Sequence, residues 1–242
     1  MSEAREALGH RAEAHGHHHA DVTGGWLRAA VFGAMDGLVT NTALVAGVGG
    51  GGVSSGTIVL SGVASLVAGA ISMSLGEYTS VKTQNEQLDL EVAKERHELE
   101  HNAEGELAEL TKMLRIRGVD DDLARQVAVQ LSRDPEVALR LHVVAEIGLN
   151  PDEKPSPMVA AVSSFVTFSV GAVIPLLPYL FGLSLLWVAL VCGGLGLVLA
   201  GALSSRFTPR PWWYAALRQL LFGAAAAGVT YLIGEAIGSA VS

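Results

Sequence analysis

Apolar residues are gathered into long stretches on either side of one strongly charged segment. A helix needs about 20 consecutive apolar residues to cross a hydrocarbon core roughly 30 Å thick. A buried helix of a soluble protein does not need this length, so the pattern predicts an all-α membrane protein. Five transmembrane helices are expected, approximately at residues 29–48, 56–78, 158–181, 183–205 and 215–241.

The charged segment, residues 80–157, has 17 acidic and 10 basic residues and a helical periodicity. No Pro or Gly interrupts the chain between Tyr78 and Gly105, so we expect the second transmembrane helix to continue into this segment. A reversal is expected at residues 102–105. Shorter helices should follow, the last with Asp134 as its N-cap. The segment is therefore predicted to be a folded helical domain rather than a disordered acidic tail.

The basic residues predict the orientation. All 16 Lys and Arg residues lie on one side of the membrane if the five helices alternate in direction. The positive-inside rule then places the N-terminus and the charged segment in the cytoplasm. We divide the chain into a His-rich tail, the first two transmembrane helices, a cytoplasmic acidic metal-binding domain and the last three transmembrane helices. Their bounds are residues 1–25, 26–80, 81–155 and 156–242.

Carboxylates recur at helical spacing within the charged segment. Two pairs of glutamates are three residues apart, and one His and one Glu are four apart, so each pair shares a helix face. Oxygen ligands with a little nitrogen suit Fe²⁺ and Mn²⁺ better than they suit a closed zinc site. Spacing alone is also compatible with solvated glutamates that pair with nearby Lys and Arg. The candidate metal ligands are Glu95, Glu98, Glu106, Glu109, His142 and Glu146.

Three residues of the first two transmembrane helices are candidates for a transport path. Asp36 lies near the middle of the first helix, where a charge costs at least about 2.5–3.5 kcal/mol to insert. Met73 offers a soft thioether, although a single Met in an apolar helix is equally explained by packing. Glu77 lies one turn further, at the cytoplasmic mouth.

The N-terminal tail carries an irregular tract of histidines. Such a tract can collect metal ions near the mouth of a transporter, or it can have no role at all, and the sequence favours neither reading. These residues are His10, His15, His17, His18 and His19.

The run RAAVFGAMDGLV at residues 28–39, the run AGAISM at residues 68–73 and the acidic segment resemble the vacuolar iron transporter family, as a bacterial-type member. The resemblance implies a five-helix fold and a homodimer with its path between the two first helices. It also implies transport of Fe²⁺ or Mn²⁺ out of the cytoplasm, coupled to protons. The implied ligands are Asp36 and Met73 in the membrane, with Glu95, Glu98, Glu106, Glu109 and Glu146 outside it.

Two positions depart from the family pattern. His142 and Val143 stand where plant-type members carry two methionines, so imidazole replaces soft sulfur and the expected preference for Fe²⁺ over Mn²⁺ decreases. Ser65 stands where those members carry a glutamate in the membrane, which removes one group that could exchange protons.

We therefore expect a homodimeric Fe²⁺ or Mn²⁺ exporter in a bacterial plasma membrane, with metal ions as substrate, no organic cofactor and no nucleic-acid partner. The alternative is a membrane-anchored metal buffer or sensor. Asp36 separates the two, because an anchor does not need a carboxylate inside the membrane. An enzyme such as a ferroxidase is not expected, because it would need facing Glu-x-x-His motifs in a four-helix bundle.

Overall fold

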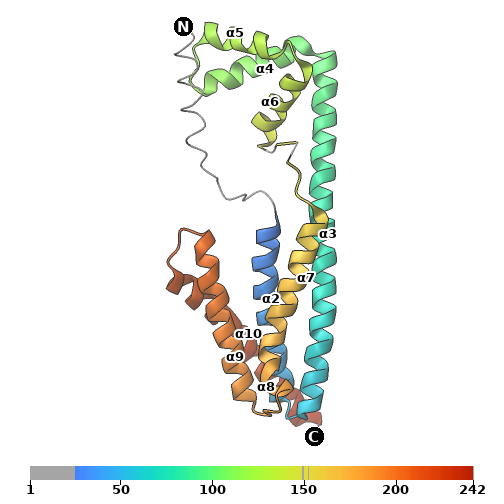
Figure 1. Cartoon of the computed structure of the whole chain (residues 1–242), viewed down its shortest axis with the longest axis vertical. Coiled ribbons are helices and arrows are strands. Elements are labelled where there is room, and N and C mark those ends of the chain that lie inside the picture. Colours follow the sequence, from blue (N-terminus) through green and yellow to red (C-terminus); the bar gives the residue numbers. More distant parts are fainter. Residues whose placement is uncertain (1–24, 149, 152, 242) are drawn as a thin grey trace, which may run out of the picture.

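The computed structural model describes residues 25–148, 150–151 and 153–241, so the tail histidines lie outside the described residues. Within this part of the chain all regular structure is helical, which confirms the all-α prediction. Five helices are long and apolar enough to cross a membrane. They form one bundle (Figure 1) and are α2 (Trp26–Gly50), α3 (Ser55–His101), α7 (Pro157–Val173) with its continuation to Leu180, α9 (Leu186–Ser204) and α10 (Trp212–Val241).

Helix α2 lies at the centre of the bundle and contacts α3, α7, α9 and α10. Its backbone lies very close to that of α7, because glycines occupy the crossing point. A Cβ atom at Gly37 would collide with the carbonyl oxygen of Phe168, and one at Gly171 would collide with that of Ala34. Since water does not drive helices together inside a lipid bilayer, such close backbone packing is a main source of their association.

A buried amide joins three helices of the bundle. Asn41 of α2 is fully buried, and its Nδ2 donates to the Gly62 oxygen of α3 at 3.2 Å and to the Ala172 oxygen of α7 at 2.7 Å. Both acceptors are backbone carbonyls inside apolar surroundings, where a lost hydrogen bond is expensive. Asn41 therefore fixes the positions of α3 and α7 relative to α2.

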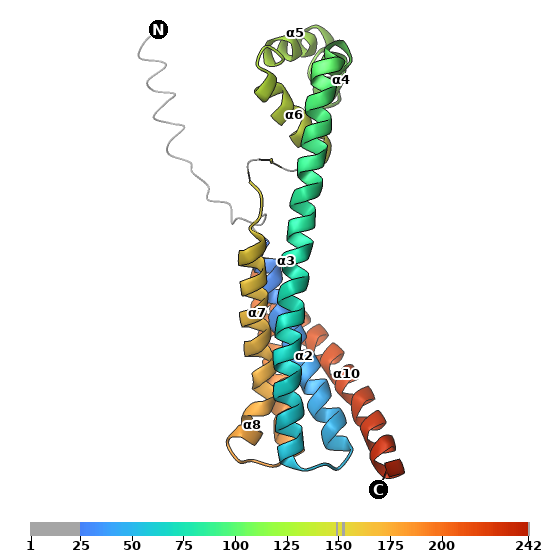
Figure 2. The same ribbon diagram turned by 90° about the vertical axis from the view of Figure 1, so that its right-hand side faces the viewer.

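The second long helix continues far beyond its apolar part. Helix α3 has 47 residues and ends at His101, as the absence of Pro and Gly predicts. The reversal is tighter than expected, because Asn102 alone separates α3 from α4. Figures 1 and 2 show the three following helices gathered at the far end of α3, away from the bundle; they are α4 (Ala103–Ile116), α5 (Asp121–Leu131) and α6 (Pro135–Ile147).

Local capping residues end and start these short helices. Gly118, two residues after the end of α4, has φ +93°, a left-handed conformation that favours glycine. The Asp134 carboxylate accepts hydrogen bonds from the backbone N–H groups of Glu136 and Val137, as expected for an N-cap before Pro135. The chain therefore turns sharply between α4, α5 and α6 and brings α6 back toward α3.

Helix α6 packs on the polar half of α3 through a small apolar core of Leu88, Leu139 and Val143. After α6 the chain runs back along α3 toward the bundle. The Asn85 side chain donates to the Pro155 carbonyl oxygen at 3.0 Å, and Lys154 forms an ion pair with Asp89. These contacts hold the returning segment against α3.

The third long helix changes geometry near its end. A single helix was expected over residues 158–181, but α7 ends at Val173 and is followed by the 3₁₀ helix η2 (Ile174–Leu176) and the short α8 (Leu177–Leu180). Pro175 and Pro178 lack a backbone N–H donor, which explains the break in the regular α-helical hydrogen bonding. Gly182, with φ +85°, then forms the turn toward α9, and η3 (Ser205–Phe207) follows α9.

We predict that Gly171→Ala lowers the stability of the bundle by about 1–3 kcal/mol, because the added methyl group overpacks the α2–α7 crossing. The measurement is the apparent melting temperature of the detergent-solubilised protein. Gly76→Ala is the matched control, since a Cβ there meets no atom within 4 Å. Equal melting temperatures for the two variants would contradict the close packing of α2 on α7.

Candidate metal centre

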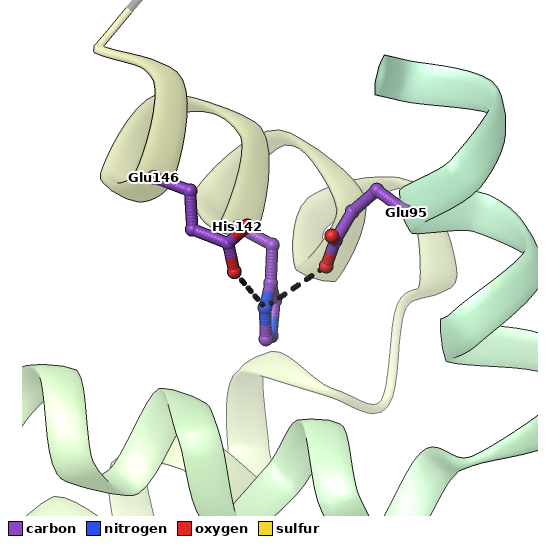
Figure 3. Close-up of side chains that lie close together, drawn as sticks. All are labelled: Glu95, His142 and Glu146. Carbon is purple, nitrogen blue, oxygen red and sulfur yellow. Dashed lines mark ion pairs between the residues drawn. The ribbon is translucent and has the colours of Figure 1, made fainter. Parts of the chain in front are cut away.

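The polar half of α3, α4 and α6 bring acidic side chains around one buried histidine. His142 comes from α6, one residue before the core residue Val143, and its side chain is fully buried. Its Nδ1 lies 3.1 Å from Glu95 Oε1 of α3 and 3.3 Å from Glu106 Oε2 of α4. Figure 3 shows Glu95 and Glu146 pointing toward the His142 ring from opposite sides, with Glu146 Oε1 3.8 Å from Nδ1.

These polar atoms are buried without satisfied hydrogen bonds. Among the described residues, Glu95 Oε1, Glu106 Oε2 and both ring nitrogens of His142 have no partner in hydrogen-bonding geometry. Leaving several such groups unsatisfied in one place is unfavourable, and native proteins rarely do so without a ligand, a proton or a bound water. Their convergence on one point is therefore itself a feature that requires a chemical explanation.

A divalent cation fits the spacing of these atoms. An octahedral ion with bonds of about 2.1 Å holds neighbouring ligand atoms about 3.0 Å apart. The separations of 3.1–3.8 Å around His142 Nδ1 are close to that value. Ligand atoms of Glu95, His142 and Glu146 all lie within 4.8 Å of one another. Three carboxylates with one imidazole form a mostly oxygen donor set, which suits Mn²⁺ and Fe²⁺.

The carboxylates also repel one another. Burial raises the pKa of Glu95 to about 7, assisted by the negative charges of Glu146, Glu106 and Glu109. Burial and the negative charge of Glu109 likewise raise the pKa of Glu146, although His142 partly opposes this. A cation at the centre would reverse the effect, because it stabilises the ionised carboxylates. We call Glu95, Glu106, His142 and Glu146 the His142 cluster.

Two of the predicted metal ligands lie outside the His142 cluster. Glu109 is exposed, yet it is near enough to affect the pKa values of Glu95 and Glu146. Glu98 is exposed, and the described structure gives it no ion pair or side-chain hydrogen bond with the cluster. A role for these two residues remains a prediction.

The three predicted path residues occupy different surroundings. Asp36 is half-buried in α2 and accepts a hydrogen bond of 3.4 Å from Thr40 Oγ1. Met73 packs against the apolar cluster of Ala70, Phe168 and Ala172. Packing within one protomer therefore explains the position of this side chain.

Glu77 is buried and accepts a hydrogen bond of 2.9 Å from Arg28 Nη2. Sequence reasoning missed this pair. The sequence feature that could have indicated the pair is that both residues lie at those ends of the first two membrane helices that are on the same side of the membrane.

We predict that the metal-free protein becomes less stable as pH rises from about 4.5 to 7. The folded state binds an extra proton there, because the pKa of Glu95 is about 7 when folded and 4.5 when unfolded. Melting temperatures in chelator should decrease over this window, by about 2–4 °C for each kcal/mol lost. Glu95→Gln should flatten the profile, while the exposed Glu100→Gln should not. An unchanged profile in Glu95→Gln would contradict the assignment.

Comparison with known proteins identifies the family. The sequence pattern of the VIT family matches residues 27–235. The chain is 38% identical to a vacuolar iron transporter of Acanthamoeba castellanii over 192 residues, which are 74% of this chain and 69% of that protein. It is 30% identical over 240 residues to vacuolar iron transporter 1 of Oryza sativa, covering 95% of this chain and 94% of the relative. These relatives are named as transporters and not as enzymes, as expected from the sequence. The chain is a member of the VIT family.

Proposed function

We propose that this protein transports Fe²⁺ or Mn²⁺ out of the cytoplasm by exchange with protons. The observation that carries the proposal is the His142 cluster, in which three carboxylates converge on a buried imidazole. The names of its relatives, vacuolar iron transporters, support a metal ion as the substrate. Five helices of membrane-spanning length support a transporter rather than a soluble binding protein.

The His142 cluster is the proposed cytoplasmic loading site of this transporter. The distribution of Lys and Arg supports a cytoplasmic location for the acidic domain, residues 81–155, inserted between the second and third membrane helices. Glu109 and Glu98 lie on α4 and α3 beside the cluster and are proposed to join it when several ions bind. His142 replaces soft sulfur by imidazole, so we expect Mn²⁺ to compete well with Fe²⁺.

Asp36, Met73 and Glu77 form the proposed path through the membrane. Asp36 is the residue whose presence is hardest to explain without a transported ion, because a carboxylate within α2 is costly to insert. Since Ser65 provides no carboxylate, proton exchange in this proposal depends on Asp36. Glu77 lies at the mouth, where a cation can exchange places with the Arg28 guanidinium.

A homodimer is part of the same proposal. An apolar groove of about 1020 Å³ runs between α2 and α10 beside Thr40, the hydrogen-bond donor to Asp36. Helix α10 is largely exposed, with only 6% of its most apolar stretch buried. A second copy against this face would bring two Asp36 carboxylates close to one axis.

Asp36→Asn is predicted to abolish metal transport while leaving folding and metal binding by the His142 cluster intact. The substitution keeps the shape of the side chain and removes the charge that would bind the ion. The measurement is Mn²⁺ or Fe²⁺ uptake into proteoliposomes with an imposed pH gradient, together with calorimetric Mn²⁺ binding. Transport should decrease by at least about tenfold, as expected when an ionised group that binds the substrate is removed.

The matched control is Glu235→Gln, which neutralises an exposed acidic residue of α10. It should retain transport. Normal transport by the Asp36→Asn variant would instead favour a membrane-anchored metal buffer, in which the cluster binds ions and the membrane helices only hold it in place.

Combined Glu95→Ala and Glu106→Ala substitutions are predicted to weaken Mn²⁺ binding to the full-length protein by at least about tenfold, because both remove ligands that converge on His142. Calorimetry in detergent measures the effect. Glu104→Ala is the control, since Glu104 is exposed and two residues from Glu106 on the same helix. An unchanged isotherm in the double variant would place the binding site elsewhere.

A further inference from the structure

Two histidines lie one helical turn apart near the end of α3. His97 and His101 are both exposed, and their ring centroids are 4.0 Å apart. Residues four apart share a helix face, so both imidazoles can reach one ion. His97 follows Glu95 by two residues, which is about 200° around the helix. The histidine pair therefore lies on the side of α3 away from the His142 cluster.

A hydrogen bond to the backbone prepares one ring for metal binding. His101 Nδ1 lies 2.8 Å from the His97 carbonyl oxygen. A carbonyl oxygen only accepts, so in the neutral ring the proton resides on Nδ1 and the lone pair on Nε2. Metal-binding histidines in proteins generally have this arrangement, in which one nitrogen donates to a fixed acceptor and the other is left to ligate.

The electrostatic surroundings favour a cation at the pair. Residues 97–111 contain five glutamates and no Lys or Arg. His101 also lies in the last turn of α3, where the carbonyl groups give the helix a partial negative charge. Both effects attract a dication, and of the five glutamates only Glu106 belongs to the His142 cluster.

We propose that His97 and His101 together bind a late first-row divalent cation such as Ni²⁺, Cu²⁺ or Zn²⁺. Imidazole suits these ions, and Mn²⁺ and Fe²⁺ bind nitrogen ligands more weakly in the general order of affinities. Water completes the coordination, because the exposed face provides two imidazoles. The protein would thus hold a class of ion different from its proposed cargo, at a separate site on the same helix.

The test is calorimetric titration of the full-length protein in detergent with Ni²⁺. His97→Ala and His101→Ala should each weaken the Ni²⁺ affinity of this site by at least about tenfold. The double variant should be no weaker than either single variant, because a chelate needs both rings and the effects are then non-additive. To remove competing ligands, all variants carry Gln in place of the tail residues His10, His15, His17, His18 and His19.

Two further variants distinguish a chelate from independent histidines. Ala93 is exposed on α3, four residues before His97. Adding Ala93→His to the His101→Ala variant recreates the spacing one turn earlier and should restore Ni²⁺ affinity. Adding Glu91→His instead keeps the number of histidines but places them on different faces, and should not restore it.

Two results would overturn the proposal. One is that each single variant loses Ni²⁺ affinity by about twofold or less and the double variant loses more. Independent ligands would behave in this way. The other is a parallel loss of Mn²⁺ binding, which would make the pair part of the His142 cluster. Unchanged Mn²⁺ binding with lost Ni²⁺ binding supports two sites. Failure of metal transport in proteoliposomes would count against the proposed function alone.

Discussion

The structure depends on the continuity of α3. Its 47 residues form one helix of about 70 Å, since each residue adds 1.5 Å. The same helix carries Met73 and Glu77 in the bundle, Glu95 at the His142 cluster and the histidine pair at its end. No flexible linker interrupts it, so the distance from the bundle to the cluster is set by helix geometry. The polar helices α4 to α6 then need only to fold back on an existing surface.

The His142 cluster illustrates how packing can hold like charges together at the expense of stability. The apolar core of Leu88, Leu139 and Val143 holds α6 against α3, and this contact forces His142 and Glu146 toward Glu95. Burial raises the pKa values of Glu95 and Glu146, and the repulsion between the carboxylates raises them further. The favourable burial of the apolar residues offsets the repulsion, so the cluster forms without an ion.

The sequence predicted correctly those features that depend only on the order of residues along the chain, such as the lengths of the helices. The lengths of the apolar stretches predicted five long helices, and the absence of Pro and Gly predicted the extension of α3. Helical spacing predicted only that each pair of glutamates shares a helix face, and it did not predict that Glu95 and Glu106 lie beside His142. Other features depend on how helices cross. The sequence could not predict that Glu106 is buried while Glu98 is exposed, since this depends on the angle set by the single residue Asn102.

The contacts inside the bundle also depend on how the helices pack. Arg28 and Glu77 are 49 residues apart, and their pairing requires α2 and α3 to lie side by side. The hydrogen bonds of Asn41 require α2 to lie between α3 and α7. A sequence shows that Asn41 is polar and within a membrane helix. It does not show which neighbouring backbone carbonyls accept from it.

The geometry of α3 also separates the two stages of the proposed transport. Glu77 and Glu95 are eighteen residues apart on one helix, or about 27 Å. One ion cannot contact both groups, so the His142 cluster cannot form part of the membrane path itself. On this proposal the cluster collects ions at a distance from the membrane, and each ion then crosses water before it reaches Glu77 at the mouth. There it meets the Arg28 guanidinium, which already holds the carboxylate at 2.9 Å. A dication must compete with this single positive charge, and its greater charge favours the exchange, so the Arg28–Glu77 pair would admit divalent ions in preference to monovalent ones.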